Sequence, residues 1–441
     1  MLAKFFRLQE HQTTVKTELL AGLTTFSTMA YILAVNPFIL SKTGMDFNAV
    51  MVATALTAIT GTLIMSLWAK LPIAVAPGMG LNAFFAYTIV LGMGYTWQFA
   101  LTAVFLEGIL FIILSLLNIR ETIINSIPTD IKKAISVGIG LFIALIGLVN
   151  AGIIETGMVS VGNHQLDGVI VKLGNMKSAA VLLVVIGLFV SAALLYRKFN
   201  AALLVGIIVA TVIGIPLGLT HLPADGKLIS LPPSIVPVFF KMQFSSIFSW
   251  DMLIILFTLL TVNLFDTVGT LIGCCTAGNL LDASGKIPNV KKALLADAVG
   301  TTAAAIFGTS VATAYIESAS GIASGGKTGL TSFTVAMLFV LALFFAPLFS
   351  IIPAAATAPA LIIVGFLMMR EVVHIDFTDI THALPAFLTI VMMPFTYSIA
   401  EGIVFGMVSY VVLKIMTGKW KEVSITMYVL ALLFLFSILI K

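Results

Sequence analysis

Three polar side chains draw attention because each lies in an otherwise apolar stretch of the chain. Asp266 lies within the run Asn-Leu-Phe-Asp-Thr, Glu317 follows a series of small residues, and Asn82 precedes two phenylalanines by two and three positions. Carboxyl and amide groups are costly in such stretches, so they are typical of a binding site or of hydrogen bonds between helices. We expect all three to form a binding site. For each acid, a neutral carboxyl bonded to a neighbouring helix is the alternative.

Proton exchange is the chemistry that the two acids suggest. Desolvation disfavours the charged form of a carboxyl group, so a group away from water exchanges its proton closer to neutral pH. We predict that Glu317 is the proton-coupling acid and that Asp266 binds the substrate directly, with the reversed and the shared assignments left open. Glu107, Asp297 and Glu401 are interpreted instead as structural acids, near helix starts or between helices.

Motifs for other chemistry occur without the surroundings that they need. Residues 321–328 fit the P-loop pattern and residues 78–83 resemble a dinucleotide fingerprint, but both patterns require a soluble sheet around them. The five histidines fall in predicted loops or ends at no ligand spacing, and the two cysteines are adjacent. We therefore expect no catalytic residue, no metal, no nucleotide cofactor and no nucleic-acid partner.

The composition places these side chains in a membrane. Of the 441 residues, 60% are hydrophobic and 10% are charged, and the mean hydropathy is +1.14. A soluble domain carries roughly 25% charged residues. The first 16 residues are polar and basic and do not resemble a signal peptide. We predict a polytopic protein of the cytoplasmic (inner) membrane that has no room for a soluble catalytic domain.

Continuous apolar runs predict an all-α membrane protein with about fourteen transmembrane segments. A last apolar segment at 424–440 is either a further span or an interfacial helix. If the amino terminus is cytoplasmic, most of the 23 Lys and Arg residues face inward, as the positive-inside rule requires. The predicted spans are 17–38, 49–69, 79–92, 98–118, 134–153, 178–196, 201–219, 248–272, 293–307, 315–326, 329–350, 355–369, 384–397 and 399–416.

The chain also repeats itself. Phe26-Ser27-Thr28 aligns with Phe265-Asp266-Thr267, and Gly61-Thr62 aligns with Gly300-Thr301, both at an offset of 265 − 26 = 239 residues. Two halves of seven spans follow. Because seven is odd, the second half enters the membrane from the opposite side, which predicts the inverted repeats that are typical of secondary transporters.

The third and tenth spans hold the same place in their halves, and each opens irregularly. The third begins at Ala74 with Pro77, Gly78 and Gly80, and the tenth begins with small residues at 308–314. Proline cannot donate a backbone hydrogen bond and glycine is a poor helix former. We expect short extended stretches followed by half-helices, whose amino-terminal N–H groups point toward a substrate.

Three segments together resemble the azaguanine-resistance-type purine permeases of the nucleobase:cation symporter group, which are related to xanthine and uracil permeases. They are APGMGLNAFFAY at 76–87, NLFDTVGTLIG at 263–273 and SVATAYIESASGIASGGKTGLTS at 310–332. The resemblance covers nearly the whole chain. It implies a mobile core domain (1–118 and 248–350, spans 1–4 and 8–11), a gate or scaffold domain (119–247 and 351–441), a homodimer and elevator-like alternating access.

The resemblance also implies a substrate. Asn82, Asp266 and Glu317 are carried over as binding positions for a purine such as hypoxanthine, guanine or adenine. A purine is flat and has N–H donors and N and O acceptors, which two acids and an amide match. The residues next to these positions, predicted to add aromatic faces and a hydroxyl, are Phe84, Phe85 and Thr267. The family commonly has an acid and an arginine where this chain has Ser324 and Lys327.

Other functions compete with purine symport. A carrier of the same fold for an inorganic or organic anion is the main alternative, but two acids in one cavity would repel an anion. A xanthine- or uracil-type base is another substrate within this alternative, whereas a channel ranks third and an enzyme fourth. A proton is the expected coupling ion, and sodium is the alternative.

Overall fold

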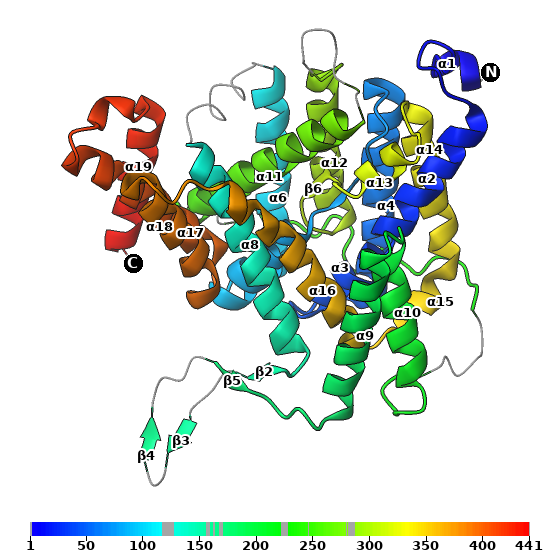
Figure 1. Cartoon of the computed structure of the whole chain (residues 1–441), viewed down its shortest axis with the longest axis horizontal. Coiled ribbons are helices and arrows are strands. Elements are labelled where there is room, and N and C mark those ends of the chain that lie inside the picture. The colour runs from blue at the N-terminus through cyan, green and yellow to red at the C-terminus, as the bar shows by residue number, and fades with distance from the viewer. Residues whose placement is uncertain are drawn as a thin grey trace.

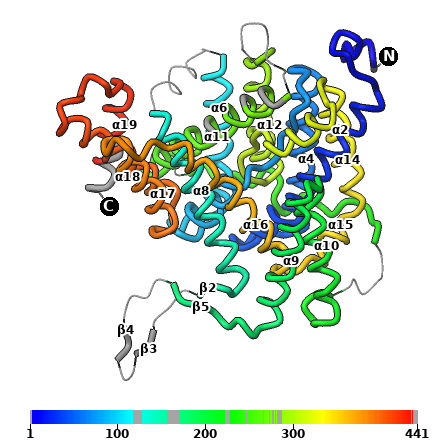
Figure 2. The backbone as a smooth tube through the Cα atoms, viewed as in Figure 1, coloured from blue at the N-terminus to red at the C-terminus, as the bar shows by residue number. Residues whose placement is uncertain are grey.

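Apolar helices make up most of the fold (Figure 1), as the composition predicts. The computed structural model describes residues 2–116, 128–155, 159–161, 164–166, 171–221, 228–245, 247–278, 280 and 287–440. The amino-terminal helices and the carboxy-terminal helix α19 lie at opposite ends of the long axis of the molecule (Figure 2). Between them, the helices pack most densely within two groups.

The first group surrounds a short pair of strands. In it, α12 packs against α4 and α6, and α14 packs against α2 and α4. We call this set the core group. Its elements are α1 (Leu2–Phe5), α2 (Val15–Met29), α3 (Ile32–Ser41), α4 (Phe47–Ile64), η1 (Met65–Ala69), β1 (Val75–Pro77), α5 (Met79–Ala83), η2 (Phe84–Gly92), α6 (Trp97–Leu116), α11 (Trp250–Ala277), α12 (Val290–Phe307), β6 (Ala312–Ala314), α13 (Ser318–Ala323), α14 (Gly329–Ala342), η3 (Leu343–Phe345) and α15 (Ala346–Ser350).

The second group is built on α8. Its partner α16 approaches closely through Gly140 and Gly365, because a Cβ atom on Gly140 would lie 2.7 Å from the carbonyl oxygen of Gly365. We call this set the scaffold group. Its helices are α8 (Thr129–Asn150), α9 (Ala179–Tyr196), α10 (Ala202–Gly214), α16 (Ala354–Met369), η4 (Arg370–His374), α17 (Ile380–Phe395), α18 (Ile399–Met416), η5 (Trp420–Glu422) and α19 (Ile425–Ile440).

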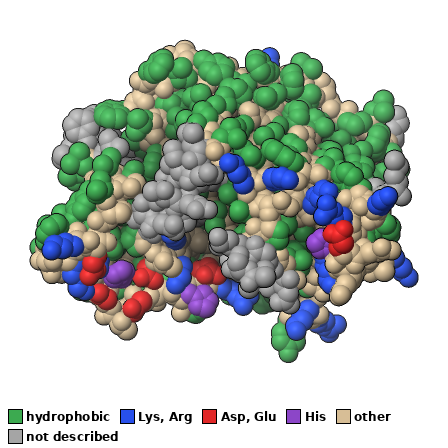
Figure 3. Space-filling model, turned by 90° about the horizontal axis from the view of Figure 1, so that it is seen from above, with side chains coloured by type: hydrophobic (Ala, Val, Ile, Leu, Met, Phe, Trp, Pro, Cys, Tyr) green, Lys and Arg blue, Asp and Glu red, His purple; other side chains and the backbone are tan. Residues whose placement is uncertain are grey.

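The surface and the helix lengths suit a membrane. Among the described residues, nine helical stretches are long and apolar enough to cross a bilayer, some of them made of consecutive elements such as α2 and α3, and three shorter helices are also apolar. Figure 3 shows hydrophobic side chains over much of one face, with most charged side chains toward its lower edge. The protein is therefore an integral membrane protein. The count of fourteen spans stays a prediction, since α13 has only six residues.

The inverted repeat predicted from the sequence is visible in equivalent contacts. The hydroxyl of Thr62 donates to the carbonyl of Val75 at 2.9 Å, and that of Thr301 donates to the carbonyl of Ala312 at 2.8 Å. The two aligned glycines meet, because a Cβ atom on Gly300 would lie 3.4 Å from the Cα of Gly61. Each half thus ties its strand to the preceding helix in the same way.

Three local features differ from the predicted spans. The first span is not one helix but α2 and α3, separated by a turn at Ala30 and Tyr31 in which the bond from Leu33 N to Ala30 O spans only three residues. The segment 84–92 is a π-helix rather than an α-helix. Two small antiparallel ladders also occur in a predicted loop, namely β2 (Ile154–Glu155) with β5 (Lys172–Leu173) and β3 (Val159–Val161) with β4 (His164–Leu166).

Candidate functional site

The candidate site is built around the crossing of β1 and β6. The strands pair antiparallel, with Ala76 opposite Thr313, and the bonds from Gly78 N to Val311 O and from Tyr315 N to Ala74 O extend the ladder at its two ends. The short helices α5 and α13 follow the strands on opposite sides of the crossing. The predicted extended stretches and half-helices of both halves therefore lie together, where backbone polar groups satisfy one another.

Glu317 lies directly before α13 and is held by the break in the first span. The hydroxyl of Tyr31 donates to Oε1 of Glu317 at 2.7 Å, and the hydroxyl of Thr28 approaches the Glu317 carbonyl at 3.4 Å. Glu317 is partly exposed. Its carboxyl group thus accepts a hydrogen bond from Tyr31, and the residue as a whole keeps some exposed surface.

Asp266 lies in the middle of α11 and reaches the same crossing. Its Oδ2 lies 3.6 Å from the position that a Cβ atom on Gly78 would occupy, and its charge is near enough to interact with that of Glu317. It is partly exposed. Gly269, one turn later, faces open space. The structure therefore places the two acids together, beside an accessible face of α11.

Asn82 belongs to α5 and faces the other half of the crossing. The hydroxyl of Ser310 donates to its amide oxygen, and its amide nitrogen lies 3.8 Å from the sulfur of Met79. The side chain is fully buried. The oxygen is thus engaged within the protein, whereas the nitrogen has only a weak sulfur acceptor and is the atom that a substrate could recruit.

Thr267 lies next to Asp266 but faces a buried polar network. Its hydroxyl is 3.0 Å from that of Thr313, 3.2 Å from Oδ1 of Asn263 and 2.9 Å from Oδ2 of Asp297. The amide of Asn263 in turn donates to Glu107 at 3.0 Å. A hydroxyl has one hydrogen to donate, and the oxygens of Asn263 and Asp297 compete for it. Contact of Thr267 with a substrate stays a prediction, and such contact would require one of these bonds to break.

The two phenylalanines after Asn82 are packed into the core group. Phe84 and Phe85 are fully buried and belong to the largest apolar cluster of the described residues. Tyr31 and Tyr315 also lie near the acids, and the hydroxyl of Tyr315 donates to the carbonyl of Pro77. Sequence reasoning missed both tyrosines because a tyrosine in an apolar run is typical of a helix that packs on others.

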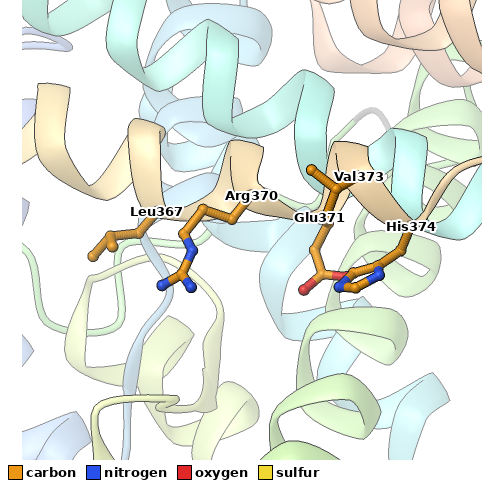
Figure 4. A pocket seen from close by; sticks show the side chains of 5 residues that line it. All are labelled: Leu367, Arg370, Glu371, Val373 and His374. Carbon is orange, nitrogen blue, oxygen red and sulfur yellow. The ribbon is translucent and has the colours of Figure 1, made fainter.

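A separate surface pocket lies at the end of α16 and along η4 (Figure 4). Leu367, Arg370, Glu371, Val373 and His374 line it. None of the predicted site residues belongs to this lining, so the pocket is distinct from the strand crossing.

The sequence matches a family model along most of its length. Residues 16–405 match the model of the Permease family, Xan_ur_permease. This chain belongs to that family. The match confirms the family resemblance inferred from the three motif segments, and it makes the chain a membrane transporter rather than an enzyme.

Curated relatives of this permease cover nearly its whole length. A putative permease of Methanocaldococcus jannaschii is 50% identical over 98% of this chain and 96% of its own. The adenine permease AdeQ of Escherichia coli is 44% identical over 100% of this chain and 96% of its own. The guanine/hypoxanthine permease PbuO of Bacillus subtilis is 43% identical over 99% of this chain and 100% of its own.

Solved structures with a similar fold include those of a bicarbonate transporter and of an anion transporter. The transmembrane domain of the cyanobacterial bicarbonate transporter BicA has a TM-score of 0.65 at 19% identity, covering 88% of this chain and 97% of that one. The murine anion transporter Slc26a9 has a TM-score of 0.62 at 11% identity, covering 91% and 68%. At these identities the likeness shows the fold alone, which agrees with the predicted polytopic architecture of inverted repeats.

Proposed function

We propose that this permease imports purine nucleobases, such as adenine, guanine or hypoxanthine. The observation that carries the proposal is that relatives named as adenine and as guanine/hypoxanthine permeases align with nearly the whole chain at 42% identity or more. The crossing of β1 and β6 presents two partly exposed acids, which are acceptors for the N–H groups on the edge of a purine.

The geometry of the site suggests how a purine would bind. Asp266 and Glu317 would accept N–H groups, and the amide nitrogen of Asn82 would donate to a ring nitrogen or an oxo group in place of its weak contact with Met79. A ligand that lacks these groups would leave the remaining acceptor positions of the two carboxyl groups unfilled, and sites of this kind reject such analogues. Binding would therefore be selective for the purine edge.

Proton symport is the coupling that we propose. Glu317 and Asp266 interact through their charges, and a purine that donates to both would favour one protonation state of the pair over the others. Glu317 remains our choice for the coupling acid, because Tyr31 fixes one of its oxygens while the residue stays partly exposed. Sodium coupling is the alternative outcome of the transport test below.

An elevator-like motion of the core group against the scaffold group is consistent with their contacts. A Cβ atom on Gly80 would lie 2.7 Å from Cγ2 of Ile139 in α8, and the amide of Asn150 donates to the hydroxyl of Tyr87 at 3.2 Å. The ring of Tyr87 also packs edge-on against Tyr397. Such small contacts between groups can re-form after a sliding movement, whereas the packing inside each group is extensive. We further propose a cytoplasmic amino terminus and a homodimer.

Uptake of radiolabelled bases by host cells without purine uptake tests the proposal. We expect saturable uptake of at least one purine, competition by unlabelled purines but not by bicarbonate or uracil, and loss of uptake with a protonophore. Asp266→Asn and Glu317→Gln should be inactive at normal protein level. The control Glu155→Gln, in an exposed ion pair with Lys172, should be active.

Uptake that bicarbonate inhibits and purines do not would instead favour an anion carrier. Uptake that follows a sodium gradient at constant pH would replace the proton.

A further inference from the structure

One face of α2 lies along the segment 317–331, which begins with Glu317. Glu18, Ala21, Thr25 and Thr28 are spaced by three or four residues, so their side chains lie on the same side of the helix. Each of them contacts α13 or its flanking residues, as the hydrogen bonds and close approaches below show. The helix therefore supports this segment along its whole length.

Glu18 binds the amino terminus of α14. Its carboxylate accepts the backbone N–H groups of Lys327 at 3.0 Å and of Thr328 and Thr331 at 3.2 Å, and also the hydroxyls of Thr328 at 2.9 Å and Thr331 at 2.6 Å. The group is fully buried. Because it accepts five bonds and donates none, it has the hydrogen-bonding pattern of an ionised carboxylate.

This contact explains the P-loop pattern at 321–328. In a P-loop, backbone N–H groups at the start of a helix surround a phosphate. Here the N–H groups of the same stretch and of the first turn of α14 surround the Glu18 carboxylate instead. The anion that such a helix terminus favours is supplied by the chain itself.

The middle of the segment rests directly on α2. A Cβ atom on Gly321 would lie 2.5 Å from the carbonyl oxygen of Ala21 and 2.1 Å from the hydroxyl oxygen of Thr25. The far end lies beside Thr28, whose hydroxyl is 3.4 Å from the backbone carbonyl of Glu317, and is held by Tyr31, whose hydroxyl donates to the Glu317 carboxyl at 2.7 Å. Residues 317–331 are thus fixed at both ends and in the middle, and the end farthest from the acid depends on Glu18.

We propose that Glu18 is a positioning residue. It is an internal anion that binds the amino terminus of α14 and thereby sets the position of Glu317. The assignment deepens the proposed function and rests on it. Removing the carboxylate leaves three N–H groups and two hydroxyls facing a buried space without an acceptor, and buried donors of this kind are costly. The segment then moves away from α2, and it carries Glu317 with it.

The space left by Glu18→Ala has the size of an acetate ion and, because hydrogen-bond donors surround it, it favours an anion. The fragment removed is that of acetate, since alanine keeps the Cβ atom. Acetate can accept the same N–H and O–H groups, whereas acetamide of the same shape would direct its own N–H donors at them. Rescue by acetate but not by acetamide is a result that a general loss of packing would not give.

Binding of radiolabelled adenine, guanine and hypoxanthine to the purified protein at one fixed pH is the experiment, because weak acids would collapse a pH gradient in a transport assay. For Glu18→Ala we expect about tenfold weaker binding or more. Acetate should restore most of it, and acetamide should not. Acetate should also raise the melting temperature of this variant but not of the wild type. Asp46→Ala is the matched control, since it removes a carboxylate that caps α4 through a single N–H group at 2.8 Å.

A second pair of variants covers the case in which Glu18→Ala does not fold. Glu18→Asp keeps the charge and Glu18→Gln keeps the size, so binding should follow the order wild type, Glu18→Asp, Glu18→Gln. Wild-type affinity in Glu18→Gln, or equal rescue by acetate and acetamide, would overturn the assignment of Glu18. A wild-type protein that binds none of the three purines would instead overturn the proposed function, and the melting experiment would still report on Glu18.

Discussion

The tightest contact at the candidate site gives the sharpest prediction. Gly78 precedes α5 with φ −76° and ψ 132°, which alanine adopts without strain. A Cβ atom there would lie 2.5 Å from Cγ2 of Thr313 on the opposing strand. The effect expected of Gly78→Ala is therefore steric, and its closest contact is with the opposite half of the repeat.

The size of the effect follows from the overlap. Carbon atoms in contact are normally about 3.5 to 4.0 Å apart, so the added methyl overlaps Cγ2 by about 1 Å. Thr313 cannot retreat freely, because β6 is paired with β1 and its hydroxyl lies 3.0 Å from that of Thr267. Overpacking of this kind costs about 1 to 3 kcal/mol, which corresponds to roughly 5- to 150-fold in a binding equilibrium.

A double-mutant cycle isolates this contact. Thr313→Ser removes Cγ2 and keeps the hydroxyl, so Gly78→Ala with Thr313→Ser should recover most of the purine binding and uptake that Gly78→Ala loses. Gly273→Ala in α11 is the control, since its Cβ atom would meet only Cδ1 of Ile316 at an ordinary 3.5 Å. Equal losses with and without Thr313→Ser would refute the explanation, because the coupling between the positions would then be zero.

Three further predictions concern other contacts. Tyr31→Phe removes a hydroxyl that donates to the candidate coupling acid, so purine binding should weaken about tenfold in the same assay, and unchanged affinity would contradict that role. Gly80→Ala should slow uptake more than it weakens binding, since its clash is with Ile139 of the scaffold group. Adding Ile139→Ala should restore the uptake rate. Equal effects on uptake and on binding would count against a contact that moves during transport. The Lys419 ammonium bonds to Asp379 at 2.9 Å and holds the pKa of that carboxyl below its ordinary value. The stability that the pair contributes is therefore fully present above the ordinary carboxyl pKa, and it is lost as the pH falls through the lowered pKa of Asp379. Asp379→Asn should thus lower the melting temperature slightly at neutral pH and not in acid, and a difference that stays constant with pH would argue against this ion pair.

The sequence was sufficient for the features that depend on local chemistry. Pro77 and the glycines around it cannot continue a helix, so the strand and half-helix of the third span were predictable. The alignment of Thr62 with Thr301 likewise predicted equivalent positions, and both hydroxyls hold a strand carbonyl. Such features require no knowledge of what lies across the bundle.

Other features depend on contacts between distant segments. No glycine or proline marks the break between α2 and α3 at Ala30 and Tyr31. This break places the hydroxyl of Tyr31 against Glu317, which lies 286 residues later in the chain. Glu18 stands near the start of an apolar run and looks like an ordinary helix-start acid, but its partners lie more than 300 residues later. These arrangements follow from which helices pack together, and a single sequence does not specify this locally.

The acids within the helices show why residue type alone could not separate binding groups from structural ones. Glu18, Glu107 and Asp297 are fully buried and are hydrogen-bonded by groups of the protein. Asp266 and Glu317 are partly exposed. A ligand can compete only for groups that it can reach, so the exposure of the residue distinguishes the candidate binding acids better than their position within an apolar helix does. The same criterion indicates that replacing a structural acid should disturb the fold around it, whereas replacing Asp266 or Glu317 should abolish binding in a protein that still folds.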